Sequence, residues 1–187
     1  MTQVQNSVQY VELAAHTLHN PASLRLMLKK ADQLIPDLLI QKLNLEPILV
    51  KLKLEKNWSW EKLLTHYLYY KQFLFLCKTQ NTTIVPTPDL DDFWHSHIED
   101  NEKYEKDCQS VFGKILYHFP YLGLRSKNDA NILTKKGKLT RKLLSTSFGI
   151  QSWSGVENAL CGSDNCAYDD DGKGISKRRP KIDLLFA

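Results

Sequence analysis

Residues 86–121, PTPDLDDFWHSHIEDNEKYEKDCQSVFGKILYHFPY, concentrate the side chains of this sequence that could do chemistry. His95 and His97 flank Ser96, His118 follows further along, and several carboxylates lie between them. Imidazole and carboxylate groups coordinate divalent metals, and imidazole exchanges protons near neutral pH. The stretch therefore predicts a polar site, but it does not name a reaction.

Helical spacing divides these side chains into two groups. Thr87 can cap a helix that has Pro88 at its first position, and Gly113 is a suitable end. With about 100° per residue, His97 lies on an apolar stripe and His95 on the polar face. The stripe comprises Leu90, Phe93, Trp94, His97, Asn101, Tyr104, Cys108, Val111 and Phe112, and the polar face Asp91, His95, Glu99, Glu102, Lys106 and Gln109. The two histidines therefore point in nearly opposite directions and do not bind one ion together.

The polar face offers the candidate metal and catalytic residues. Asp91 precedes His95 by one helical turn, so its carboxylate can orient the imidazole. Pro120 favours an extended chain just before it, and a turn there could return His118 to this face. Asp91, His95 and His118 would then form a two-histidine, one-carboxylate set suited to zinc or iron. The alternative is an exposed Asp–His ion pair without a ligand.

The apolar stripe supports a structural interpretation of the remaining motif residues. A buried His97 must be hydrogen-bonded or metal-bound. We expect a neutral core histidine bonded to a backbone carbonyl or to Tyr104, while a closed site of His97, Cys108 and His118 stays open as an alternative.

The same stretch resembles the glycine-rich domain-containing protein-like family, also called DUF1399. The family pattern is an Asp, then Trp-His-x-His, Tyr, Asp-Cys, Phe-Gly and a closing His-x-Pro. The matching positions are Asp91, Trp94, His95, His97, Tyr104, Asp107, Cys108, Phe112, Gly113, His118 and Pro120. The resemblance covers roughly residues 58–166 and implies a helical domain without a settled activity.

Plant members of that family have been linked to stress responses and RNA binding through glycine-rich segments. This chain has 8 glycines in 187 residues and no glycine-rich tail, so RNA binding is not carried over. The net charge of +4 is too small to indicate nucleic acid by itself. We expect no nucleic-acid partner, although the basic segment 135–142 keeps phosphate contact open as a minor alternative.

The composition is that of a globular protein, with 42% hydrophobic and 25% charged residues. The first residues lack the pattern of a signal peptide, and the apolar run from Leu63 to Cys77 is too short and polar to span a bilayer. Four cysteines do not make a secreted disulfide framework. We expect a cytoplasmic protein, with export by a route that needs no signal peptide left open.

Helical spacing dominates elsewhere and predicts an all-α, single multi-helix domain with an irregular C-terminal tail. We expect an N-terminal helical part over 1–57, a helical core over 58–160 that carries the family resemblance, and a flexible or partner-ordered tail over 161–187. The helical part should contain a stripe from Val4 to Leu18, a helix capped by Asn20, and a kink or two short helices around Pro47. Segment 135–142 is expected to be a solvated turn and helix start.

Two functions follow from these expectations. In the first, the domain binds a divalent metal or small ligand in a polar pocket formed by Asp91, His95 and His118, and hydrolysis by an activated water is the simplest reaction. In the second, the domain is a non-enzymatic interaction module. Its His/Tyr/Cys motif is then structural, and its partner binds segment 135–142 or the tail. The role of Cys161 and Cys166 in the tail stays open between half a zinc site, a redox pair and free thiols.

Overall fold

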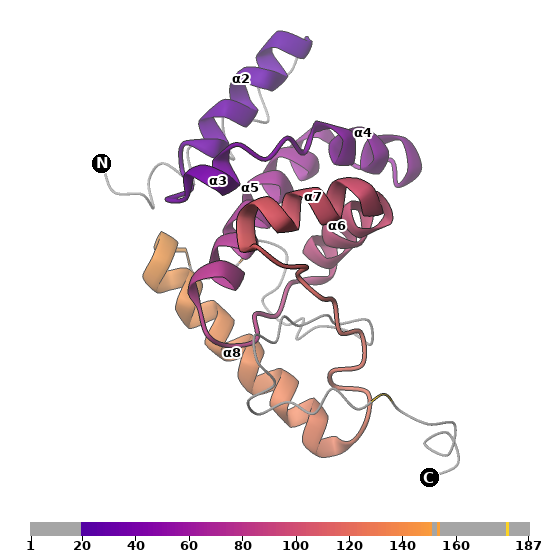
Figure 1. Ribbon diagram of the computed structural model, residues 1–187, viewed down its shortest axis with the longest axis vertical. Helices are drawn as coiled ribbons and strands as arrows, with labels where there is room; N and C mark the ends of the chain where they lie inside the picture. Colours follow the sequence, from indigo (N-terminus) through magenta and orange to yellow (C-terminus); the bar gives the residue numbers. More distant parts are fainter. Residues whose placement is uncertain (1–19, 151–152, 154–178, 180–187) are drawn as a thin grey trace.

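The computed structural model describes residues 20–150 together with residues 153 and 179, and within them it is all-α. The helices are α2 (Pro21–Asp32), α3 (Leu38–Gln41), α4 (Glu46–Glu55), α5 (Trp60–Thr79), α6 (Pro88–Glu99), α7 (Asn101–Phe112) and α8 (Lys127–Phe148), as shown in Figure 1. The described part contains no β-strand, and it fits a single domain. The predicted fold class is therefore confirmed.

Some expectations concern other parts of the chain. The stripe from Val4 to Leu18, the boundary at 160/161, the tail over 161–187 and its two cysteines lie outside the described residues. The division at 57/58 stays a prediction.

Helix α5 is the centre of the molecule. It packs against α2, α3, α4 and α6, and fourteen of its twenty residues are buried. A helix that is apolar on all faces has to be surrounded by other elements. The aromatic residues of α5 belong to the main hydrophobic core, as do the apolar residues of α6 and α7. This core is the support on which the candidate site is built.

Most helices begin directly after a residue whose side chain caps them. The side chains of Asn20, Ser59 and Thr87 accept hydrogen bonds from the backbone N–H groups of Ser23, Lys62 and Leu90, as capping residues do. Pro47 does not kink a long helix but lies in the first turn of α4, so two short helices form there.

The expected single helix from Pro88 to Gly113 is wrong, because the structure divides it at Asp100. This residue has φ −84° and ψ 72°, and its side chain caps α7 by accepting a hydrogen bond from Lys103 N–H. An Asp followed by Asn is typical of a cap and weak in a helix interior. Residues after Asp100 therefore do not continue the helical wheel of α6. Gly113 does end α7, in the left-handed conformation with φ 68°.

Segment 135–142 is also different from the expectation, since it lies inside the long helix α8 rather than at a turn. Gly137 costs about 1 kcal/mol in a helix interior. That cost is offset by a face on which Leu133, Thr140, Leu144 and Phe148 are buried. Thr140 Oγ1 accepts a hydrogen bond from Val85 N–H at 3.1 Å, which fixes the helix to the loop before α6.

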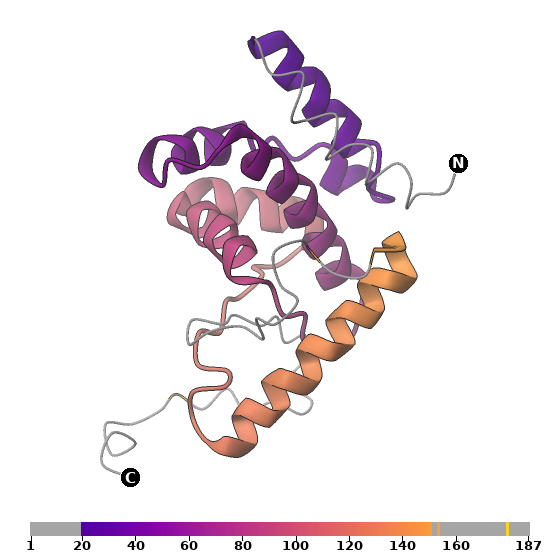
Figure 2. The same cartoon turned by 180° about the vertical axis from the view of Figure 1, so that it is seen from behind.

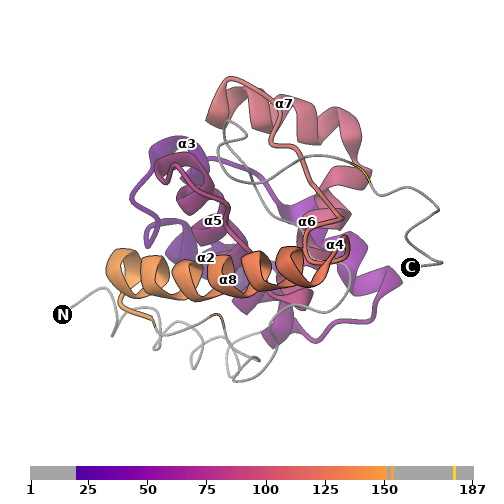
Figure 3. The ribbon, with the colours of Figure 1, turned by 90° about the horizontal axis from the view of Figure 1, so that it is seen from below.

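Helix α8 lies at the edge of the helical bundle (Figures 1 and 2). Its inner face packs on loop residues Val85 and Leu122, and its C-terminal end contacts α5 through Phe148 and Phe75. Seen from below, α8 crosses in front of the other helices (Figure 3). Among the helices of the described part, none is long and apolar enough to cross a membrane.

Candidate functional site

Helix α6 begins the candidate site by placing Asp91 and His95 one turn apart. His95 Nδ1 lies 2.9 Å from the carbonyl oxygen of Asp91 and 3.2 Å from its carboxylate Oδ2. Donation of the Nδ1 proton to these oxygens leaves the Nε2 lone pair of a neutral ring free. His95 remains half-exposed, with 41% of its side chain accessible. The ring is therefore held at one nitrogen and available at the other.

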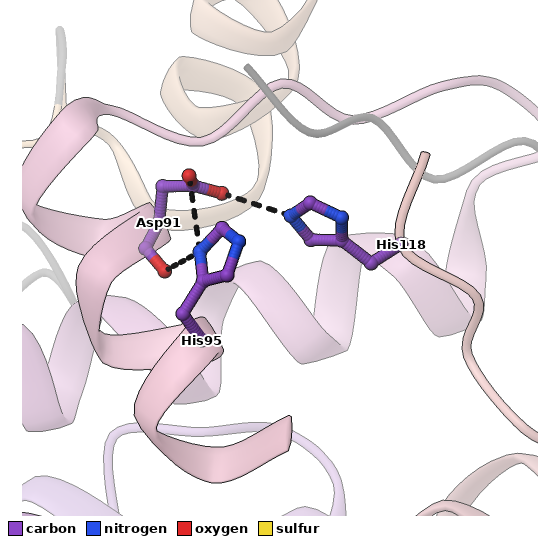
Figure 4. A group of neighbouring side chains, drawn as sticks. All are labelled: Asp91, His95 and His118. Carbon is purple, nitrogen blue, oxygen red and sulfur yellow. Dashed lines mark hydrogen bonds and ion pairs between the residues drawn. The ribbon is translucent and has the colours of Figure 1, made fainter. Parts of the chain in front are cut away.

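His118 comes to the same place from the loop that follows α7. Its ring centre lies 4.3 Å from that of His95, and its Nε2 lies 3.6 Å from Asp91 Oδ1. The Trp94 ring packs against the other side of His118, with centres 4.9 Å apart. Figure 4 shows the two imidazoles and the carboxylate turned toward one another. One potential ligand atom from each of the three residues lies within 4.8 Å of the other two.

Asp91 is more buried than the helical wheel predicts. It was expected on the polar face, yet only 5% of its surface is accessible. The loop carrying His118 lies against this part of α6 (Figure 4), and a wheel of α6 alone cannot include that cover. The carboxylate is thereby buried beside this loop rather than left in bulk water.

The surroundings shift the pKa values of the two imidazoles in opposite directions. The hydrogen bond to Asp91 raises the pKa of His95 above its usual value, against the effect of burial. Burial, aided by the neighbouring His95, lowers the pKa of His118 to about 4. His118 is therefore a neutral ring at physiological pH, which is the form that binds metals.

Two atoms of this cluster are buried without a hydrogen-bond partner among the described residues. They are Asp91 Oδ1 and His118 Nε2, and their separation of 3.6 Å exceeds a hydrogen bond. Unsatisfied buried polar atoms are costly and rare. Two ligands at about 2.1 Å from a tetrahedral zinc ion stand about 3.4 Å apart, close to this separation. The donor set therefore fits a divalent cation.

His97, two residues from His95, faces the core and has a different environment. It is 1% exposed, its Nδ1 lies 2.9 Å from the Tyr70 hydroxyl and its Nε2 lies 3.0 Å from Asp107 Oδ2. The expected partner was a backbone carbonyl or Tyr104, which instead contacts the ring edge-on with centres 5.0 Å apart. Both ring nitrogens are satisfied, so His97 serves the fold.

Asp107 completes this inner network from α7. Burial opposes ionisation, but hydrogen bonds from His97 and Lys103 outweigh it and lower the pKa of the carboxyl group. An ionised Asp107 accepts the Nε2 proton of His97, whose Nδ1 then accepts from the Tyr70 hydroxyl.

A second chain of hydrogen bonds connects the core to the loop of His118. Trp94 Nε1 donates to the Tyr104 hydroxyl at 2.9 Å, and that hydroxyl donates to the carbonyl oxygen of Leu116. Cys108 also contacts the Leu116 backbone and the Tyr104 hydroxyl. Leu116 is only two residues from His118. The buried motif therefore holds in place the loop that carries the third residue of the site.

The remaining motif residues have positions consistent with structural roles. Pro120 lies in the turn after His118, and Cys108 is a buried free thiol. The alternative set of His97, Cys108 and His118 is not assembled, because His118 lies against His95 instead and both nitrogens of His97 are occupied.

The sequence did not identify two of the groups in these two hydrogen-bond networks. Tyr70 lies on α5, and the Leu116 carbonyl belongs to the backbone, which carries no sequence signal. Tyr70 is 27 positions from His97 in the sequence, and such a distance gives no local pattern.

Fold and site together define an all-α domain with three potential metal ligands at the contact between a helix and a loop. The chain belongs to the UCP032817-like family, whose model matches residues 40–137, just over half of the chain. This family is uncharacterised, so membership brings no activity with it. The matched range contains the Asp91 cluster and the inner network. No curated protein and no solved structure matches the chain.

Proposed function

We propose that this domain binds a divalent transition-metal ion through Asp91, His95 and His118. The observation that carries the proposal is the pair of buried atoms Asp91 Oδ1 and His118 Nε2, which have no hydrogen-bond partner in the described part of the chain and lie beside a third potential ligand. Two imidazoles and one carboxylate are ligands of zinc and of non-haem iron. The resemblance to the glycine-rich domain-containing protein-like family supports it as well, since its Trp-His-x-His pattern includes the half-exposed His95.

A site of this kind is suited to catalysis more than to structural support. Structural zinc sites have four protein ligands, whereas catalytic sites keep a position open. Three protein ligands would leave one position open, and the half-exposed His95 gives solvent access to the site. A bound ion would supply Lewis acidity there, and hydrolysis by an activated water is the reaction that needs least beyond these residues. Asp91 would orient His95 through the Nδ1 contact.

The cellular location that fits this proposal is the cytoplasm. Cys77 and Cys108 are buried free thiols of the core. Reduced cysteines are typical of reducing compartments.

Metal content and metal-dependent stability test the proposal. The full chain is purified without an affinity tag, its metals are measured, and the metal-free protein is titrated with Zn²⁺ and, without oxygen, with Fe²⁺. We expect a bound metal near one equivalent, or a rise in melting temperature with added metal. A content below about 0.1 equivalent together with no stabilisation by either ion would overturn the proposal.

Neighbouring residues provide a matched control. Asp91→Asn and Asp92→Asn each remove one carboxylate from the same turn of α6. Asp92 is half-exposed and forms its ion pair with Lys56 at 2.6 Å, whereas Asp91 pairs with the imidazoles. We expect Asp91→Asn and His95→Ala to abolish metal stabilisation and Asp92→Asn to retain it. Equal losses in both Asp variants would show that added metal binds the acidic surface without using the cluster.

The second candidate is a non-enzymatic interaction module with a structural motif. It is favoured by one observation, that His97, Tyr104 and Asp107 have their hydrogen bonds satisfied within the fold. In that case a protein partner would bind through the C-terminal tail. A pull-down that is lost on deletion of residues 161–187, from a protein without metal, would favour this candidate.

A further inference from the structure

Helix α8 presents a line of lysines on its outer face. Lys127, Lys135, Lys138 and Lys142 are all exposed, and at about 100° per residue they fall within an arc of about 80°. From the first to the last, the line is about 22 Å long. Arg141 is half-exposed at the edge of the same arc.

These lysines differ from those on the central helices. All five lysines of α5 and α7 form ion pairs: Lys62, Lys71, Lys78, Lys103 and Lys106. The four lysines of the α8 line have no ion pair with any described residue. The one acidic residue of α8, Asp129, is buried and bonded to Arg125. The positive charge of this face is therefore left uncompensated over the described part of the chain.

The chemistry of the face narrows the type of partner. The buried centre of a protein interface is typically apolar, and on α8 only Leu139, 36% exposed, adjoins the lysines. Single-stranded nucleic acid is bound with aromatic side chains on which bases stack, and α8 has only the buried Phe148. Helix α8 lies at the edge of the helical bundle (Figures 2 and 3). A line of exposed lysines on such a helix matches a flat, negatively charged surface.

We propose that the outer face of α8 binds the surface of membranes that contain anionic lipids. The attraction is electrostatic, between lysine ammonium groups and lipid headgroups, and no apolar segment needs to enter the bilayer. Binding of this type is reversible and weakens with salt. It would bring the domain to a membrane surface without a spanning helix, and it does not depend on the proposed metal site.

Vesicle co-sedimentation of the full chain tests this proposal. The vesicles are phosphatidylcholine alone or with about 30 mol% phosphatidylserine. The variant K135Q/K138Q/K142Q removes three charges from the line. The control K29Q/K30Q/K42Q removes three charges from exposed lysines near α2 and α3 that have no ion pair in the described part. Both variants are first compared with the wild-type protein by circular dichroism and melting temperature.

We expect binding to the anionic vesicles only, with loss at high salt. The α8 variant should lower the partition constant about 100-fold, and the control variant should leave it near the wild-type value. Absence of binding at low salt would overturn the proposal, as would an equal loss in both variants, which would indicate net charge alone. Binding of a single-stranded RNA through the same lysines, without vesicle binding, would assign the face to nucleic acid and reject the membrane.

Discussion

The two sides of helix α6 carry similar residues, but these residues differ in whether their polar atoms are hydrogen-bonded. On the inner side, His97 has both ring nitrogens hydrogen-bonded, to Tyr70 and Asp107. On the outer side, Asp91 and His118 each keep one buried atom that no described residue hydrogen-bonds. Both sides combine imidazole with carboxylate, so residue type alone does not separate them. The difference lies in what each polar atom contacts.

This difference separates a histidine that stabilises the fold from one that is available to a ligand. A satisfied buried network stabilises the native structure and leaves nothing for a ligand. A network with unsatisfied buried atoms costs stability, and such atoms are typical of places where an ion or other ligand binds. The inner side therefore explains the stability of the domain, and the outer side is where a function is sought.

The largest expected effect comes from breaking the inner side. His97→Ala removes a buried ring, leaves the Tyr70 hydroxyl without its imidazole partner and leaves Asp107 bonded to Lys103 alone. We expect a loss of about 3 kcal/mol in the free energy of unfolding, or roughly 6–12 °C in melting temperature. Urea unfolding and differential scanning calorimetry of the metal-free protein measure it.

The matched substitution on the outer side is His95→Ala. Its half-exposed ring can be replaced by water, which then solvates Asp91. We expect a change below about 1 kcal/mol in the metal-free protein. Similar large losses for both variants would contradict the division of α6 into a structural and a functional side.

A medium effect is expected where the two sides are connected. Tyr104→Phe removes the hydroxyl that bonds Trp94 and the Leu116 carbonyl, and so loosens the loop of His118. We expect a loss of about 1–3 kcal/mol in stability. If the metal proposal holds, zinc affinity should also fall several-fold, although Tyr104 belongs to no ligand set. Isothermal titration with Zn²⁺ below the melting temperature of the variant separates the two effects. Unchanged zinc affinity would show that the loop is held by other contacts.

The sequence was sufficient for the features that depend on local spacing. Capping residues and prolines located the starts of α2 and α6, and the spacing within α6 placed His97 on the inner face. Asp91 and His95 are also local neighbours on that helix. Asp100 is also a local capping signal. The sequence analysis did not predict a helix start there, because the apolar periodicity continues past this residue.

Features that depend on distant parts of the chain could not be predicted in this way. The burial of Asp91 and the partner of His97 arise from a loop and from α5, which packing alone brings into contact with α6. The extent of α8 likewise depends on Val85 and Leu122, which bury one face of a helix containing Gly137. Local sequence signals do not report such contacts.

A change in how stability depends on pH separates the two histidines of the outer side. The pKa of His118 is lowered to about 4 in the folded protein, against about 6.5 in the unfolded chain. Between these values the unfolded chain binds a proton that the native protein does not. Stability of the metal-free protein is therefore lost as pH falls from about 6.5 toward 4.

His95 acts with the opposite sign. Its pKa is raised in the folded protein, so its contribution is fully present below about 6.5 and is lost as pH rises through the folded value. We expect His118→Gln to flatten the fall in stability between pH 7 and 5, and His95→Gln to steepen it. Urea unfolding at several pH values measures both slopes. A parallel shift of both curves, with unchanged slopes, would mean that neither ring is held at the altered pKa that the outer side requires.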